Sequence, residues 1–154
     1  MMTLFVITAL LLGIAGIVYA AKKLGTVPDS VSSSAYTMPD VCFTLWIASI
    51  GALILPCMLE RLPDDWRWIG FFAVIGLLCV AATPFYKTDN GGLHYSGGIM
   101  CALCATAITV FLCPNLLWAW SVYLMAMLLC RWRCWCFWGE VTVFVLLCAA
   151  LTIF

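Results

Sequence analysis

The chain has 154 residues, of which 66% are hydrophobic and 9% are charged, and its seven acidic residues balance its seven basic ones. A soluble domain of this length must cover its core with many more polar side chains, so the composition excludes a water-soluble globular protein. The charged residues lie between or at the edges of long apolar runs, which is typical of a protein that crosses a membrane several times. We therefore expect membrane lipids as partners and no nucleic acid.

A membrane-spanning helix needs about 20 mostly apolar residues. Residues 3–21 form the first such run, which stops at Lys22 and Lys23. The positive charges follow the run instead of preceding it, so we expect a retained span and not a cleaved signal peptide. The polar stretch 24–40 comes next and is expected to be a loop or one short interfacial helix, with Asp29 or Ser30 as its N-cap.

The second and third expected spans cover residues 41–59 and 68–85. The charged segment between them contains Trp66 and Trp68, which we expect at the level of the lipid headgroups. The third run is short, although Trp68 and Phe85 extend it.

The remaining spans are expected at residues 93–113, 115–130 and 138–154, with a turn at Pro114-Asn115. The last two are slightly short, which local bilayer thinning or tryptophan anchors accommodate. The fold class expected is thus all-α, an integral membrane six-helix bundle in a single domain over residues 1–154. Five or four spans are the alternatives.

The charge distribution predicts an orientation for six spans. Five basic residues fall on one side, namely Lys22, Lys23, Lys87, Arg131 and Arg133. Arg61 and Arg67 fall on the other. The positive-inside rule then places the first, third and fifth loops in the cytoplasm and both termini outside, most simply in a bacterial inner membrane. We expect Lys22, Lys23, Arg131 and Arg133 to contact lipid headgroups.

Besides packing, the ten cysteines have two functional interpretations, thiol exchange and zinc binding. Cys101 and Cys104 form a C-x-x-C pair, but this pair lies about two turns into its helix, too deep for easy thiol exchange with a soluble partner. Cys130, Cys134 and Cys136 with His94 could hold zinc, but their C-x3-C-x-C spacing is not a usual zinc pattern. Cysteine also behaves as a small hydrophobe, and we expect no metal and no other cofactor.

The single histidine, His94, belongs to a polar group that six spans would gather at the cytoplasmic rim of the bundle. The candidate ligand-binding residues are Ser30, Ser32, Asp89, His94, Tyr95 and Glu140. Four interpretations stay open. These residues cap and pair within the fold, or bind a lipid headgroup or small ligand. Alternatively, they line a channel formed by a homo-oligomer, or supply a serine activated by His94 for lipid hydrolysis. We expect no catalytic residue, and binding is the leading functional hypothesis.

Small residues such as Gly13, Gly97 and Gly98 let helices approach closely. The same residues serve a contact within one bundle or between copies, so a homo-oligomer is an expectation that the sequence leaves open.

Four segments carry a resemblance to a known group of proteins. They read VPDSVSSSAYT, FTLWIASIGALILP, ATPFYK and GLHYSGG. Across roughly residues 27–105, the chain resembles uncharacterised small multi-span membrane proteins of gut Bacteroidota and their phages. More distantly, the serine-rich loop with Pro84 and His94 is similar to DRAM-like six-span proteins. This resemblance implies a six-helix fold more than an activity.

Overall fold

The structure is a computed structural model that describes residues 1–86, 91–130 and 134–153. Within these residues the chain is helical and contains no strand. The expectation of an all-α fold is therefore confirmed.

Six long helices occupy the six apolar runs. They are α1 (Met2–Leu24), α2 (Asp40–Arg61), α3 (Arg67–Ala81), α5 (Gly91–Leu112), α6 (Leu117–Cys130) and α7 (Trp135–Ile153). Short elements connect them, namely the helix α4 (Thr83–Tyr86) and the 3-10 segments η1 (Ser32–Tyr36), η2 (Asp64–Trp66) and η3 (Pro114–Leu116).

Helix length divides these elements into two groups. Among the described residues, α1, α2, α5 and α7 are long and apolar enough to cross a membrane. Helices α3 and α6 have 15 and 14 residues. At 1.5 Å per residue they are roughly 21–23 Å long, which is less than the hydrocarbon thickness of about 30 Å. Four membrane-length helices are compatible with an integral membrane protein, and the expected number of six spans stays a prediction.

Pro84 explains why the expected third span is divided into α3 and α4. In a continuous helix the carbonyl of Val80 would accept a hydrogen bond from the backbone N–H of residue 84, which proline lacks. The hydroxyl of Thr83 replaces that donor and lies 2.5 Å from the Val80 oxygen. The α-helix accordingly ends at Ala81 and a separate turn begins at Thr83.

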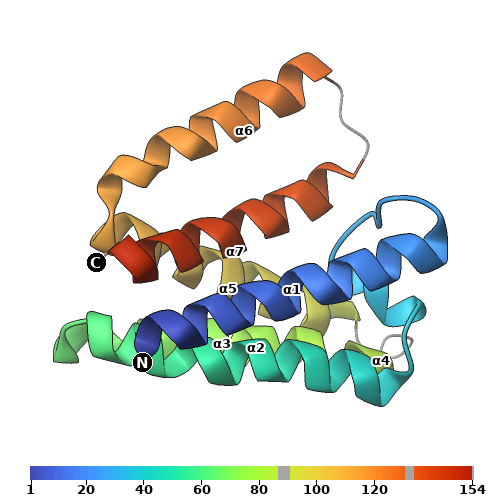
Figure 1. Ribbon diagram of the computed structural model, residues 1–154, viewed down its shortest axis with the longest axis horizontal. Helices are drawn as coiled ribbons and strands as arrows, with labels where there is room; N and C mark the ends of the chain where they lie inside the picture. The colour runs from blue at the N-terminus through green and yellow to red at the C-terminus, as the bar shows by residue number, and fades with distance from the viewer. Residues whose placement is uncertain (87–90, 131–133, 154) are drawn as a thin grey trace.

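Five helices form a closed ring. Neighbouring pairs in contact are α1 with α2, α2 with α3, α3 with α5, α5 with α7, and α7 with α1. The long helices run back and forth along one common direction (Figure 1). The N-terminus and the end of α7 lie at one end of the bundle, and the loop after α1, α4 and the start of α7 lie at the other (Figure 1). We call this second end the loop end.

The outward surface of the bundle is apolar. On α1 the exposed side chains Leu4, Ile7, Leu11, Ile14 and Val18 recur every three or four residues and so form one stripe. Helix α3, despite its length, also exposes large apolar side chains, namely Phe71, Phe72, Ile75 and Leu78. A surface of this kind suits contact with lipid and not with water.

Two contacts show how closely the ring helices approach. The indole N–H of Trp46 on α2 donates a hydrogen bond to the Leu12 carbonyl of α1 at 2.8 Å. Between α3 and α5, a Cβ added to Gly76 would lie 2.5 Å from the carbonyl oxygen of Gly97. Gly97 therefore serves a helix contact within the chain, which is one of the two uses that the sequence left open.

Helix α6 lies outside the ring, beside α7 (Figure 1). None of its described side chains is buried. Its attachment to α7 includes a hydrogen bond of 2.6 Å from the Tyr123 hydroxyl to the Trp135 carbonyl. Helix α6 thus adds little to the core and presents most of its apolar surface outward.

Candidate functional site

A partly open apolar cavity of about 170 Å³ lies among the helices of the ring. Side chains from α1, α2, α3, α5 and α7 line it. They include Ile50 and Ile54 of α2, Leu77 of α3, Cys101 of α5 and Leu147 of α7. A cavity of about 150 Å³ with such a lining holds a molecule the size of benzene, so this cavity is large enough for a small apolar group.

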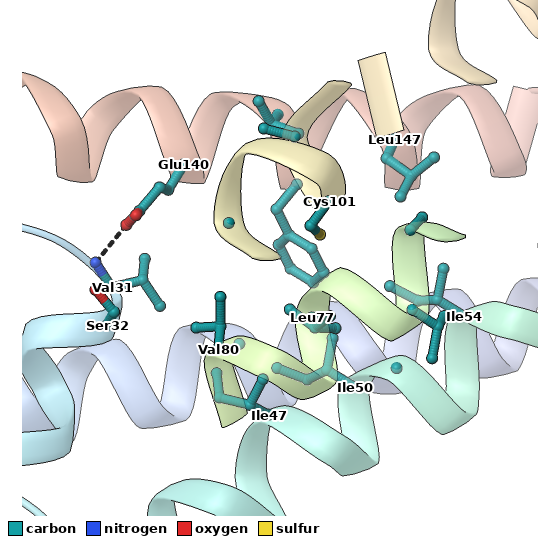
Figure 2. A pocket seen from close by; sticks show the side chains of 18 of the residues that line it. Val31, Ser32, Ile47, Ile50, Ile54, Leu77, Val80, Cys101, Glu140 and Leu147 are labelled. Carbon is teal, nitrogen blue, oxygen red and sulfur yellow. Dashed lines mark hydrogen bonds between the residues drawn. The ribbon is translucent and has the colours of Figure 1, made fainter. Parts of the chain in front are cut away.

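One end of the cavity is polar. Ser32 and Glu140 are among its lining residues, and they lie at the loop end of the bundle, away from Ile54 and Leu147 (Figure 2). Both are half-buried. We call Ser32 and Glu140 the polar end of the cavity. Two groups that six spans would gather at one rim therefore do come together, although 108 residues separate them in the sequence.

The Glu140 carboxyl group connects α7 to the loop that follows α1. Its Oε2 accepts a hydrogen bond of 2.5 Å from the backbone N–H of Val31 (Figure 2). Its Oε1 lies 3.8 Å from the thiol sulfur of Cys136, one turn earlier on α7. A carboxylate has about four acceptor positions, so these two contacts leave room for a further donor.

A second hydrogen bond fixes the loop on the start of α7. The backbone N–H of Phe137 donates to the carbonyl of Asp29 at 3.2 Å. In addition, the Cys134 sulfur lies 3.5 Å from Asp29 Oδ1. The first backbone N–H groups of a helix have no partner within it, so the loop satisfies one of them from outside.

Serine side chains give the loop its shape. The backbone N–H of Ser33 donates to the Ser30 hydroxyl at 3.0 Å, and the backbone N–H of Ser30 donates to the Ser33 hydroxyl at 3.2 Å. This reciprocal pair closes the turn that leads into η1, whose N-cap is Val31 and not Asp29 or Ser30 as expected from the sequence. The Ser30 hydroxyl also lies 2.9 Å from the hydroxyl of Ser32. Ser30 thus orients Ser32 but does not line the cavity itself.

His94 occupies a separate position at the start of α5. Its Nδ1 lies 2.8 Å from the hydroxyl oxygen of Thr83, and that hydroxyl donates to the Val80 carbonyl. Because the single proton of Thr83 is used on Val80, Nδ1 is the donor of this pair. The arrangement joins α4 to α5 and is opposite to that of a hydroxyl activated by a histidine base.

Three other predicted site residues, Tyr95, Lys22 and Lys23, are not part of the cavity. Tyr95 is exposed and makes an edge contact with His94, their ring centres being 5.4 Å apart. Lys22 is exposed, and Lys23 donates a 2.5 Å hydrogen bond to the Thr37 carbonyl. Asp89, Arg131 and Arg133 lie outside the described residues.

The cysteines do not gather into a metal site within the part of the chain that the structure describes. No group of three or more His, Cys, Asp or Glu side chains there could hold a metal ion. The side chain of Cys130, which the zinc interpretation needs, lies outside that part. Cys101 instead lines the cavity.

Sequence reasoning missed the cavity and most of its lining. Trp46 and Phe144 both line it, yet in the sequence they read as ordinary apolar residues of two spans. No periodicity marks a gap between helices, because inward residues beside a cavity and inward residues in a packed core are equally apolar. Glu140 was the one available signal, since a carboxylate near the start of an apolar run is costly unless it has partners.

Comparison with known proteins gave no match, whether with protein-family models, curated proteins or solved structures.

Proposed function

We propose that this chain is a six-span, non-enzymatic membrane protein that binds a small amphiphilic ligand, with the ligand's apolar part in the cavity and its polar part at Ser32 and Glu140. One observation carries the proposal. An apolar cavity of about 170 Å³ ends at a carboxyl group and a hydroxyl group. Concave apolar sites with a few convergent polar groups are the usual form of small-molecule sites.

The proposed orientation follows the charges. The loop end carries Lys22 and Lys23, whereas Arg61 and Arg67 belong to the segment joining α2 to α3 at the other end of the bundle. With the loop end in the cytoplasm of a bacterial inner membrane, the ligand enters from the cytoplasmic leaflet. Lys22, Arg131 and Arg133 would attract anionic headgroups there, at about 1 kcal/mol each.

The two alternative functions have weaker support. A channel needs a polar path, whereas the cavity is apolar except at one end. A hydrolase that uses His94 needs a hydroxyl that donates to the imidazole, whereas the Thr83 hydroxyl donates to Val80. Binding is the function that uses the observed arrangement without further groups.

Photolabelling of the purified full chain in phosphatidylcholine nanodiscs tests the proposal. The probe is a phenyl diazirine, whose ring is close to the cavity in size. We expect it to label Ile50 or Ile54 inside the ring as well as outward residues such as Leu45. The substitution Ala102→Phe, which adds a ring at the cavity wall, should abolish the inner labelling and retain the outer.

Ala107→Phe is the matched control, since Ala107 is an exposed residue of the same helix and does not line the cavity. It should leave both kinds of labelling unchanged. If the inner residues are not labelled in the wild-type chain, or if Ala102→Phe leaves their labelling unchanged, the proposed function is wrong.

A further inference from the structure

The polar end of the cavity restricts the chemistry of what the cavity can hold. Glu140 presents a carboxyl group and Ser32 a hydroxyl, whereas the indole N–H of Trp46, which also lines the cavity, is already donated to the Leu12 carbonyl. No basic side chain in the described part of the chain lines the cavity. The site therefore offers hydrogen-bond acceptors, with negative charge when Glu140 is ionised, and no cation of its own within those residues.

Hydrogen bonds hold Glu140 and Ser32 in place but leave some of their acceptor positions free. Val31 and Cys136 each occupy one position on the Glu140 carboxylate, from opposite oxygens. The Ser32 hydroxyl has one contact of 2.9 Å, to Ser30. Both groups retain lone pairs for a ligand, and the loop contacts fix where those lone pairs lie.

The apolar part of the cavity limits the size of the ligand's apolar segment. The volume of about 170 Å³ is close to that of a cavity that accommodates benzene, which has six carbon atoms. Polar groups are confined to one end (Figure 2), so the ligand must carry its polar group at one end too.

We infer that the ligand of this cavity is a single-chain amphiphile whose head donates hydrogen bonds, a primary amine or an alcohol, followed by an apolar segment of about six carbons. An ammonium head pairs with the Glu140 carboxylate, and an alcohol donates to it. A fatty acid is disfavoured, because its carboxylate would lie next to that of Glu140 in surroundings of low polarity, where like charges repel strongly. This inference rests on the proposed function and adds the chemical class of the ligand.

The test compares three probes that differ only in the head. Six-carbon chains with a diazirine at the far end carry an amine, an alcohol or a carboxylic acid, and each is presented to the full chain in nanodiscs at pH 7. We expect the amine and the alcohol to label Ile54 or Leu147 at least tenfold more than the acid. Unlabelled hexylamine should compete with both.

Glu140→Gln keeps an acceptor oxygen and removes the charge, so it separates the two heads. We expect it to reduce labelling by the amine about tenfold, to leave labelling by the alcohol within about twofold, and to raise labelling by the acid. Glu60→Gln is the control, because Glu60 is an exposed acid at the opposite end of the bundle and should change none of the three.

Two outcomes overturn the inference while leaving the proposed function in place. One is equal inner labelling by the acid and the amine in the wild-type chain. The other is an unchanged preference for the amine in Glu140→Gln. By contrast, absence of inner labelling with all three probes and with the neutral phenyl diazirine overturns the proposed function itself.

Discussion

The Oε2 atom of Glu140 lies 2.5 Å from the backbone nitrogen of Val31, a residue 109 positions earlier in the chain. This hydrogen bond joins the last helix to the first loop at the end of the cavity. The same carboxyl group therefore has a structural role and a proposed ligand-binding role. The two can be separated, because the hydrogen bond to Val31 needs only an acceptor oxygen, whereas pairing with an ammonium head needs negative charge.

Glu140→Ala should destabilise the fold, whereas Glu140→Gln should not. Alanine leaves the half-buried N–H of Val31 without an acceptor, at a cost of about 1–3 kcal/mol, and glutamine retains an acceptor oxygen. Thermal unfolding in detergent micelles, followed by circular dichroism, measures the difference. Equal stability of the alanine variant and the wild type would show that the contact contributes nothing. Glu60→Ala provides the baseline for losing an exposed acid.

Gly97 and Gly98 are adjacent, and we expect opposite responses when each becomes alanine. A Cβ on Gly97 would overlap the Cβ of Cys79 and lie 3.0 Å from the Gly76 carbonyl oxygen, so α3 and α5 must separate. A Cβ on Gly98 would meet Val80 at 3.8 Å, which is ordinary contact. Gly97→Ala should cost about 1–3 kcal/mol. Gly98→Ala should stay within about 0.5 kcal/mol of the wild type. Unfolding of both variants in one detergent checks this, and equal losses would contradict the α3–α5 contact.

Gly16 and Trp46 should be energetically coupled. A Cβ on Gly16 would overlap the indole ring of Trp46, which the hydrogen bond to Leu12 keeps in place. We therefore expect Gly16→Ala to destabilise the fold by about 1–3 kcal/mol.

In the W46F background, which lacks both the second ring and the N–H donor, the cost of Gly16→Ala should fall by at least about 0.5 kcal/mol. A double-mutant cycle on the four proteins measures this coupling. Strict additivity would mean that the two residues do not touch in the membrane.

Tyr123→Phe should loosen α6 without unfolding the ring. The substitution removes the hydroxyl that donates to the Trp135 carbonyl at 2.6 Å and retains the ring. Amide hydrogen exchange in residues 117–130 should become faster, while exchange in α2 and α5 stays unchanged. Tyr95→Phe, at an exposed tyrosine of α5, is the control and should alter neither. A global loss of protection in Tyr123→Phe would mean that α6 belongs to the core.

The position of Asn115 distinguishes six spans from four. With six spans, the α5–α6 turn lies outside, on the same side as the segment around Asp65. If only α1, α2, α5 and α7 cross, Asn115 lies inside and Asp65 outside. An epitope tag inserted after Asn115 should therefore be accessible to antibody on intact spheroplasts. A tag after Asp65 should be accessible under either topology. Accessibility of the second tag alone would reject six spans.

The sequence determined the helices, because their signals are local. Each apolar run contains a helix. The residues that interrupt the runs ended or began elements near the expected positions, as shown by Gly25, with its positive φ of 70°, and by Pro114 at the start of η3. The division of residues 68–85 was not predicted. Its prediction required recognising that Pro84 interrupts the helix although the residues around it are apolar. The hydrogen bond from the Thr83 hydroxyl to the Val80 carbonyl shows that the helix is interrupted there.

The grouping of the polar residues was decided only by the tertiary structure. Composition and topology placed Ser32, His94 and Glu140 at one end of the bundle, but they could not say that Ser32 and Glu140 share a cavity while His94 pairs with Thr83. The side chains facing outward and those facing inward are equally apolar in this chain, so no pattern along the sequence distinguishes a filled interior from a hollow one. That difference depends on how five helices pack around one another, with Gly16 and Gly97 allowing close approach at some crossings and the space beside Ile50 and Leu77 left open.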